Sequence, residues 1–68
     1  MEFIVKEVKG EAAVKALMEH GIGFSEAFAV VNDALDAGIS DILTTDGKIS
    51  VLASMDGLTV SAWKEVVA

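Results

Sequence analysis

Residues 24–38 read FSEAFAVVNDALDAG, and the expected fold class follows from this stretch. Its apolar side chains repeat with a helical period and occupy one half of the wheel: Ala27, Phe28, Val30, Val31, Ala34, Leu35 and Ala37. Ala29 and four polar residues occupy the other half: Glu26, Asn32, Asp33 and Asp36. Ser25 is placed to cap the first turn and Gly38 to end the last. The pattern predicts an amphipathic helix with one face on a core.

Two further elements are predicted before this helix. Residues 2–8 are rich in β-branched and aromatic side chains and predict a strand. Apolar residues on both of its faces favour a central or covered position in a sheet. Residues 11–20 predict a helix, and Gly21 is expected to adopt the left-handed conformation that ends it, with Ile22 folding back on the helix.

Residues 41–53 predict a β-hairpin around Asp46-Gly47, a strong type I′ turn signal. A two-residue loop at this dipeptide pairs Leu43 with Ser50 and Ile42 with Val51. One face of the hairpin then carries Ile42, Ile49, Val51 and Ala53, and the helices should cover it. On the opposite face, Leu43 and Leu52 are expected to project away from the core.

The segment after the hairpin allows two interpretations. As a helix capped by Thr59, it places six apolar residues on one side: Leu58, Val60, Ala62, Trp63, Val66 and Val67. As a third strand of a meander continuing through Asp56-Gly57, it places Trp63 beside Ser50 on the polar face. The helix needs fewer exceptions and is preferred. The expectation is a single α+β domain over residues 1–68, in the order β-α-α-β-β-α, with two amphipathic helices on one face of a hairpin and an N-terminal strand.

Composition narrows the function classes. Eleven acidic residues face five lysines without any arginine, for a net charge of −6. Because proteins bind nucleic acids mainly by neutralising phosphates with Lys and Arg, nucleic acid is an improbable partner. Cysteine is absent, which excludes disulfides and thiolate sites and fits a reducing, cytoplasmic setting. No apolar run approaches the roughly 20 residues that span a bilayer, so no membrane partner is expected.

No catalytic, metal or cofactor site is predicted, and no small-molecule substrate is evident. The only histidine, His20, is expected to serve at a helix end, and Ser25 as a cap. No base, oriented by a third group, is placed beside a nucleophile. Calcium-loop and phosphate-loop spacings are missing.

The order strand, helix, helix, hairpin, helix resembles a winged helix-turn-helix core. The turn between the two helices of such folds corresponds to Leu17, Gly21 and Ile22. A recognition helix followed by a wing resembles residues 34–39 followed by the Asp46-Gly47 hairpin. The tail of such regulators is similar to Leu58-Thr59 followed by a Trp-bearing helix. The resemblance implies DNA binding. The corresponding helix, however, would present acidic residues to the groove, with Asn32 as the one plausible base reader.

The preferred hypothesis is a non-enzymatic interaction protein, of the inhibitor or regulator type carried by viruses and mobile elements. It would bind a basic, nucleic-acid-handling protein through Glu26, Asn32, Asp33 and Asp36, with Leu43, Leu52 and Trp63 as an apolar contact. The competing interpretation of the acidic helix face is simple solvation. Two alternatives are a winged-helix regulator that contacts DNA through Asn32, Lys48 and Lys64, and an assembly subunit whose core is completed by self-association.

Overall fold

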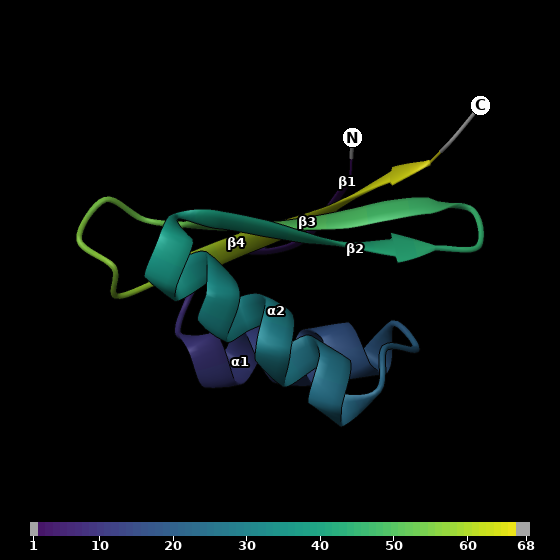
Figure 1. Cartoon of the computed structure of the whole chain (residues 1–68), viewed down its shortest axis with the longest axis horizontal. Coiled ribbons are helices and arrows are strands. Elements are labelled where there is room, and N and C mark those ends of the chain that lie inside the picture. Colours follow the sequence, from purple (N-terminus) through teal and green to yellow (C-terminus); the bar gives the residue numbers. More distant parts are fainter. Residues whose placement is uncertain (1, 67–68) are drawn as a thin grey trace.

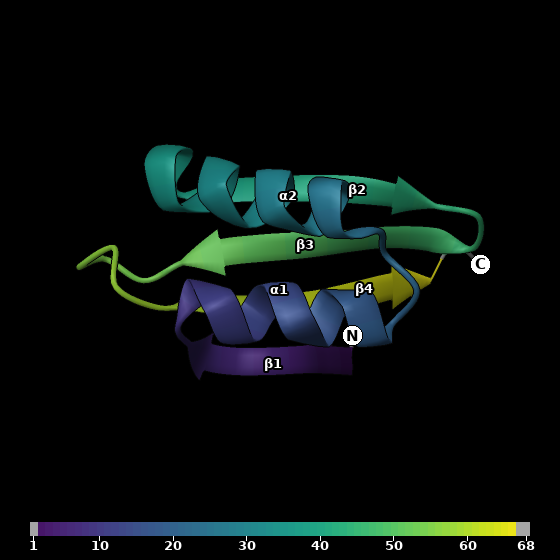
Figure 2. The same ribbon diagram turned by 90° about the horizontal axis from the view of Figure 1, so that it is seen from below.

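The computed structural model describes residues 2–66, which form a two-layer α+β structure. The elements are β1 (Glu2–Val8), α1 (Gly10–Glu19), α2 (Phe24–Ala37), β2 (Ile39–Thr44), β3 (Gly47–Ala53) and β4 (Val60–Val66). The strands form one antiparallel sheet in the order β1-β4-β3-β2. Both helices lie against the same face of the sheet (Figure 1). Seen from the helix side, α1 runs beside β1 and β4, and α2 runs beside β2 and β3 (Figure 2). The predicted α+β class is confirmed.

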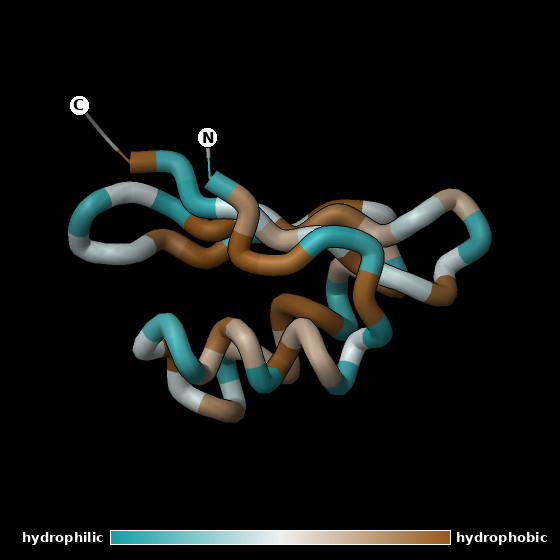
Figure 3. Tube along the Cα trace, turned by 180° about the vertical axis from the view of Figure 1, so that it is seen from behind, coloured by the Kyte–Doolittle hydropathy of each residue, from teal (hydrophilic) through white to brown (hydrophobic). Residues whose placement is uncertain are grey.

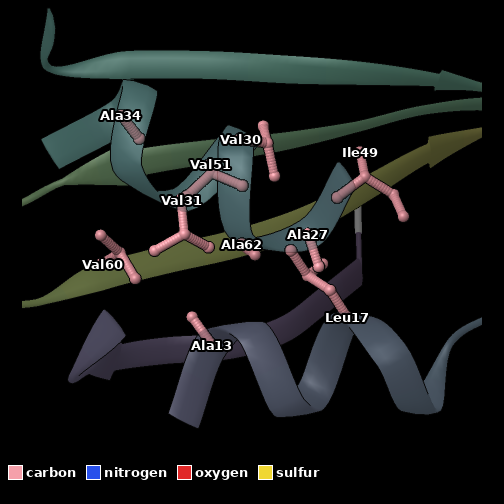
Figure 4. Packing of buried hydrophobic residues seen from close by; sticks show 10 residues of the cluster. All are labelled: Ala13, Leu17, Ala27, Val30, Val31, Ala34, Ile49, Val51, Val60 and Ala62. Atoms are coloured by element: carbon pink, nitrogen blue, oxygen red, sulfur yellow. The ribbon is translucent and has the colours of Figure 1, made fainter. Parts of the chain in front are cut away.

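The core lies between the helices and the sheet. Figure 3 shows apolar and hydrophilic residues alternating along the helical segments, as amphipathic helices require. Within residues 2–66, the buried apolar residues come from both layers and point toward one another (Figure 4): Ala13, Leu17, Ala27, Val30, Val31, Ala34, Ile49, Val51, Val60 and Ala62. Four of the ten are alanines, so the helices can lie close to the sheet.

The preferred helix for the tail is wrong, and the alternative third strand is correct. Residues 60–66 form β4, which pairs with β3 on one side and with β1 on the other. Without β4, the backbone groups of β1 would have no strand to pair with, and this non-local requirement outweighs the local helical pattern. Ser50 does face Trp63, as the strand alternative predicted. Val67, which the helical interpretation also used, lies outside the described residues.

The tail strand also removes one part of the winged-helix resemblance. A strand stands where the short Trp-bearing helix was expected. Thr59, the expected helix cap, instead donates its backbone N–H to Ser54 Oγ at 3.1 Å. The winged-helix relationship itself stays a prediction.

Of the two positions expected for β1, the central one is wrong, because β1 is an edge strand, whereas α1 covers one of its faces. Two β-bulges interrupt the alternation of its side chains, so that neighbouring apolar residues can point to the same face. The register against β4 shifts between Phe3 and Val5 and again between Val5 and Val8. Ile4, Val5 and Val8 therefore all pack against the core. At the second bulge Glu7 adopts a left-handed φ of 54°, and its N–H donates to Ser61 Oγ at 2.9 Å.

The β2–β3 hairpin has the predicted faces but a different register. Its two-residue loop is Thr45-Asp46, and Gly47 is already the first residue of β3. Ile42 consequently faces Ile49 rather than Val51. Because the register moves by two residues, each side chain keeps its predicted face. Gly47 is buried against β4, where a Cβ would collide with the backbone carbonyl oxygen of Glu65.

The predicted cap at the C-terminal end of α1 is confirmed, whereas the predicted cap at the N-terminal end of α2 is wrong. After α1, the Gly21 N–H donates to Met18 O at 3.0 Å and the Ile22 N–H to Leu17 O at 3.1 Å, which is the predicted left-handed cap. Ser25, the expected cap of α2, lies inside the helix, and Gly23 occupies the cap position without a side-chain bond. Within the described part of the chain, no helix is long and apolar enough to cross a membrane.

Candidate protein-interaction surface

The outer side of α2 carries the acidic residues that the sequence singled out. Ala27, Val30, Val31 and Ala34 are buried against the sheet, and this packing sets the rotation of the helix. The four predicted binding residues are consequently exposed: Glu26, Asn32, Asp33 and Asp36. Their predicted orientation toward solvent is therefore found in the structure.

These four residues do not form a single ridge. Asn32 Nδ2 donates to Phe28 O at 2.9 Å, and the side chain lines a groove between α1 and α2. Asp33 lies about 100° further around the helix, since each residue advances by that angle. Glu26 borders a different hollow, of about 560 Å³, together with Asp46 and Lys64 of the sheet. The three carboxylates thus share the outer face of α2, within about 80° of one another, and Asn32 belongs to the groove.

The net charge is confined to one part of the chain, and sequence reasoning missed this. Residues 1–15 hold three lysines and three glutamates, and residues 48–68 hold two lysines and two acidic residues, so both segments are neutral. Residues 16–47 hold no lysine and six acidic residues: Glu19, Glu26, Asp33, Asp36, Asp41 and Asp46. Glu19 lies at the end of α1, which runs beside β1 and β4. The other five acids lie on α2, β2 and the β2–β3 turn, which run together along one side of the molecule (Figure 2). We call this the acidic side. Counting charge by segment would have found it.

Ion pairs concentrate the remaining charge on α2. Lys48 Nζ lies 3.9 Å from Asp41 Oδ2, and Lys64 Nζ lies 3.0 Å from Asp46 Oδ2. Both lysines come from outside the acidic segment and neutralise the acids of the hairpin. The carboxylates of α2 have no such ion pair within residues 2–66. They are therefore available to a cationic partner.

Two loop carboxylates are stabilised in their charged form. Hydrogen bonds from Lys64 and Thr44 hold the pKa of Asp46 below its ordinary value of 3.8. Hydrogen bonds from the Ser54 hydroxyl and from the Leu58 N–H, the latter at 3.0 Å, likewise lower the pKa of Asp56. Asp46 and Asp56 each stabilise a turn through these hydrogen bonds, so both residues have a structural role.

The predicted apolar contact lies on the uncovered face of the sheet. Leu43, Leu52 and Trp63 all belong to this face, because the alternate residues Ile49, Val51 and Ala62 point into the core on the helix side. Leu43 is 81% exposed, whereas Trp63 is partly buried and packs edge-on against Phe3, with ring centroids 6.1 Å apart. The Trp63 indole N–H also donates to Glu65 Oε1 at 3.1 Å.

The three residues are not brought together into one patch. The cross-strand neighbours of Leu43 and Trp63 are Lys48 and Ser50 of β3, and the Asp41–Lys48 ion pair lies next to Leu43. Leu52 instead faces Ile39 across the hairpin. Polar groups therefore divide the apolar residues of this face into small groups, which makes it a weaker candidate for a partner than the helix side.

The groove between α1 and α2 is a feature that sequence reasoning missed. Phe24 and Phe28 stack at its mouth, with ring centroids 5.7 Å apart, and they remain 58% and 42% exposed. The groove has a volume of about 500 Å³ and is lined by Gly10, Glu11, Val14, Phe24, Phe28, Val31, Asn32 and Leu35. The helical wheel of α2 could have indicated this groove. Its apolar half is wider than the arc that packing on one sheet can cover, so some apolar side chains must lie outside the helix–sheet contact.

The remaining residues that could carry chemistry have structural positions. His20 caps α1, with its Nδ1 3.1 Å from Ala16 O. Across residues 2–66, no group of three or more His, Cys, Asp or Glu side chains is arranged to hold a metal ion. Comparison of the chain with protein-family models, with curated proteins and with solved structures finds no match.

Proposed function

We propose that this protein is a non-enzymatic interaction module that binds a basic protein surface through its acidic side. The observation that carries the proposal is the charge distribution: residues 16–47 hold six acidic residues and no lysine, and five of the six lie on α2, β2 and the β2–β3 turn, along one side of the molecule. A chain of this composition whose acidic residues were evenly distributed would be charged but would have no preferred orientation toward a partner.

The exposed carboxylates of α2 support this assignment. A charged surface of one sign accelerates encounter with a surface of the opposite sign and orients the two molecules before contact. A protein that handles nucleic acid offers a basic surface built for phosphates, and the carboxylates of Glu26, Asp33 and Asp36 can occupy it instead. The protein would then act as an inhibitor or regulator of that partner. A cytoplasmic setting belongs to the same proposal, because the chain contains no cysteine.

The test is a pair of matched charge variants. Glu26→Gln, Asp33→Asn and Asp36→Asn together neutralise α2, whereas Glu2→Gln, Glu7→Gln and Glu65→Gln remove three charges from β1 and β4. Proteins retained on the immobilised wild-type chain from a lysate of its source organism are identified, purified and titrated with each variant. We expect the α2 variant to bind about 10-fold more weakly, from about 0.5 kcal/mol per exposed pair, and the control to bind like the wild type.

Two further measurements distinguish the proposal from its alternatives. Binding should weaken as salt rises, and the protein should displace duplex DNA from the captured partner. Equal affinity of the two charge variants would contradict the proposal. So would direct binding of this chain to DNA in a gel shift at low salt, because that result would favour the winged-helix alternative.

A further inference from the structure

The groove between α1 and α2 has the dimensions of a binding site for a helix. Along α2 it extends from Phe24 to Leu35, eleven residues or about 16 Å, which matches three turns of a docked helix. Its floor includes Val14 and Val31, and Phe24 and Phe28 form a stacked aromatic wall. A pair of half-exposed phenyl rings beside an apolar floor is the kind of surface that receives the apolar face of an amphipathic helix.

A close contact between the helices sets one end of the groove. A Cβ added to Gly10 would lie 3.4 Å from both Leu35 Cδ1 and Val31 Cγ1, so the start of α1 lies against the last turns of α2. Two residues of this contact, Gly10 and Leu35, are followed by acidic ones, Glu11 on α1 and Asp36 on α2. Both are exposed, and Glu11 lines the groove. This end of the groove therefore has one carboxylate in its lining, Glu11, and a second, Asp36, next in sequence to the lining residue Leu35.

Charge selects among the possible occupants of the groove. A second copy of the chain would bring another net charge of −6 against the acidic side. An apolar ligand with a carboxylate would meet Glu11 and Asp36. Lys15, one turn beyond Glu11 on α1, provides one positive charge away from the acidic end. The best match is a helix that is apolar on one face and cationic beside it.

We propose that this groove binds a cationic amphipathic α-helix of the partner. Apolar side chains at positions i, i+4 and i+7 of that helix pack on Phe24, Phe28 and Val14. Lysines or arginines flanking this apolar face lie near Glu11 and Asp36. The inference rests on the proposed function, because it names the element of the basic partner that the acidic side receives.

A pair of model peptides tests the groove separately from general charge attraction. One is a 14-residue peptide of leucine and lysine with leucines at helical spacing, and the other is a scrambled peptide of the same composition. Each is titrated into the ¹⁵N-labelled protein and followed by amide chemical shifts and by calorimetry. We expect the amphipathic peptide to shift amides of Gly10, Val14, Phe24, Phe28 and Leu35, and to bind at least about 10-fold more tightly than the scrambled one.

Variants on the two faces of the molecule sharpen this test. Phe28→Ala should weaken binding of the amphipathic peptide about 10-fold. Phe3→Ala, which removes an exposed phenyl ring from the open sheet face, should leave the affinity for this peptide unchanged. If Phe28→Ala does not fold, as judged by circular dichroism, Glu11→Gln with Asp36→Asn serves instead. This pair should weaken the amphipathic peptide by about 5-fold.

Each contrary result has a separate meaning. Equal binding of the two peptides, with shifts spread over the outer side of α2, would overturn the groove while leaving the proposed function intact. Equal binding of a leucine–glutamate peptide would overturn the cationic occupant. Failure of both lysine peptides to bind would overturn the groove and would also count against the acidic side as a binding surface.

Discussion

The α2–β2 half and the α1–β1 half of the molecule share an architecture but differ in charge. In each half a helix lies over an edge strand and an inner strand. Residues 2–19, which form β1 and α1, mix three lysines with four glutamates, whereas the charged residues of α2 and β2 are all acidic. Since core packing constrains only the inward side chains, the outward ones are free to differ. The shared core packing therefore determines the positions of the helices and strands, and the outward side chains of one half determine the proposed specificity for a basic partner.

The largest expected effect on stability comes from a substitution that disrupts the pairing of β3 with β4, where the two halves meet. Gly47→Ala places a Cβ against the carbonyl oxygen of Glu65 and should cost about 4 kcal/mol or more, enough to unfold a domain of this size. Gly57→Ala is the matched control. Gly57 also has a positive φ, of 71°, but nothing lies within 4 Å of a Cβ there, so the cost should be about 1 kcal/mol. Urea unfolding measures both, and equal losses would contradict the steric explanation.

The next effect tests how much α1 contributes to the shared core. Leu17 is the largest of the fully buried side chains. Leu17→Ala should lower the free energy of unfolding by about 3 kcal/mol, through lost burial and a residual cavity. Met18→Ala, at the next and exposed position, should cost less than about 1 kcal/mol. A similar loss at both positions in thermal unfolding would show that α1 is not held by this face.

A smaller effect of opposite sign is expected at the bulged edge of the α1–β1 half. Glu7 adopts a φ of 54°, a conformation that glycine accepts without a steric penalty. Glu7→Gly should therefore stabilise the protein by about 0.5 kcal/mol. Lys6→Gly, one residue earlier at an ordinary φ, should instead destabilise it by about the same amount. Differential scanning calorimetry checks the two signs, and a loss of stability in both variants would refute backbone strain at Glu7.

The smallest effect concerns the ion pair that links the hairpin turn of the acidic half to β4. The pKa of Asp46 is lower in the folded protein than in the unfolded chain, so its contribution to stability is present above the ordinary value of 3.8 and is lost as pH falls below it. Asp46→Asn should lower the melting temperature slightly at pH 7. This difference should shrink as the pH falls below 3.8 and disappear once the wild-type carboxylate is protonated. A difference that stays constant as the pH falls would contradict a charge-based role.

Much of the local structure could be predicted because it follows from short-range periodicity. The buried face of α2, the left-handed cap at Gly21 and the two faces of the β2–β3 hairpin each depend on residues close in sequence. The outward orientation of Glu26, Asp33 and Asp36 followed from the same helical period. The groove could not be predicted, because Gly10 and Leu35 meet only when α1 and α2 pack together.

By itself, the sequence determined the α+β composition of the domain, which side chains of α2 face solvent, and the absence of positive charge between residues 16 and 47. Only the tertiary structure decided that residues 60–66 are a strand, that β1 lies at the edge, and that the uncompensated acids gather on one side of the molecule. The physical reason is that helical and strand periods are local properties of the chain. Strand pairing and surface charge distribution instead depend on backbone groups and side chains that are distant in sequence and meet only after folding.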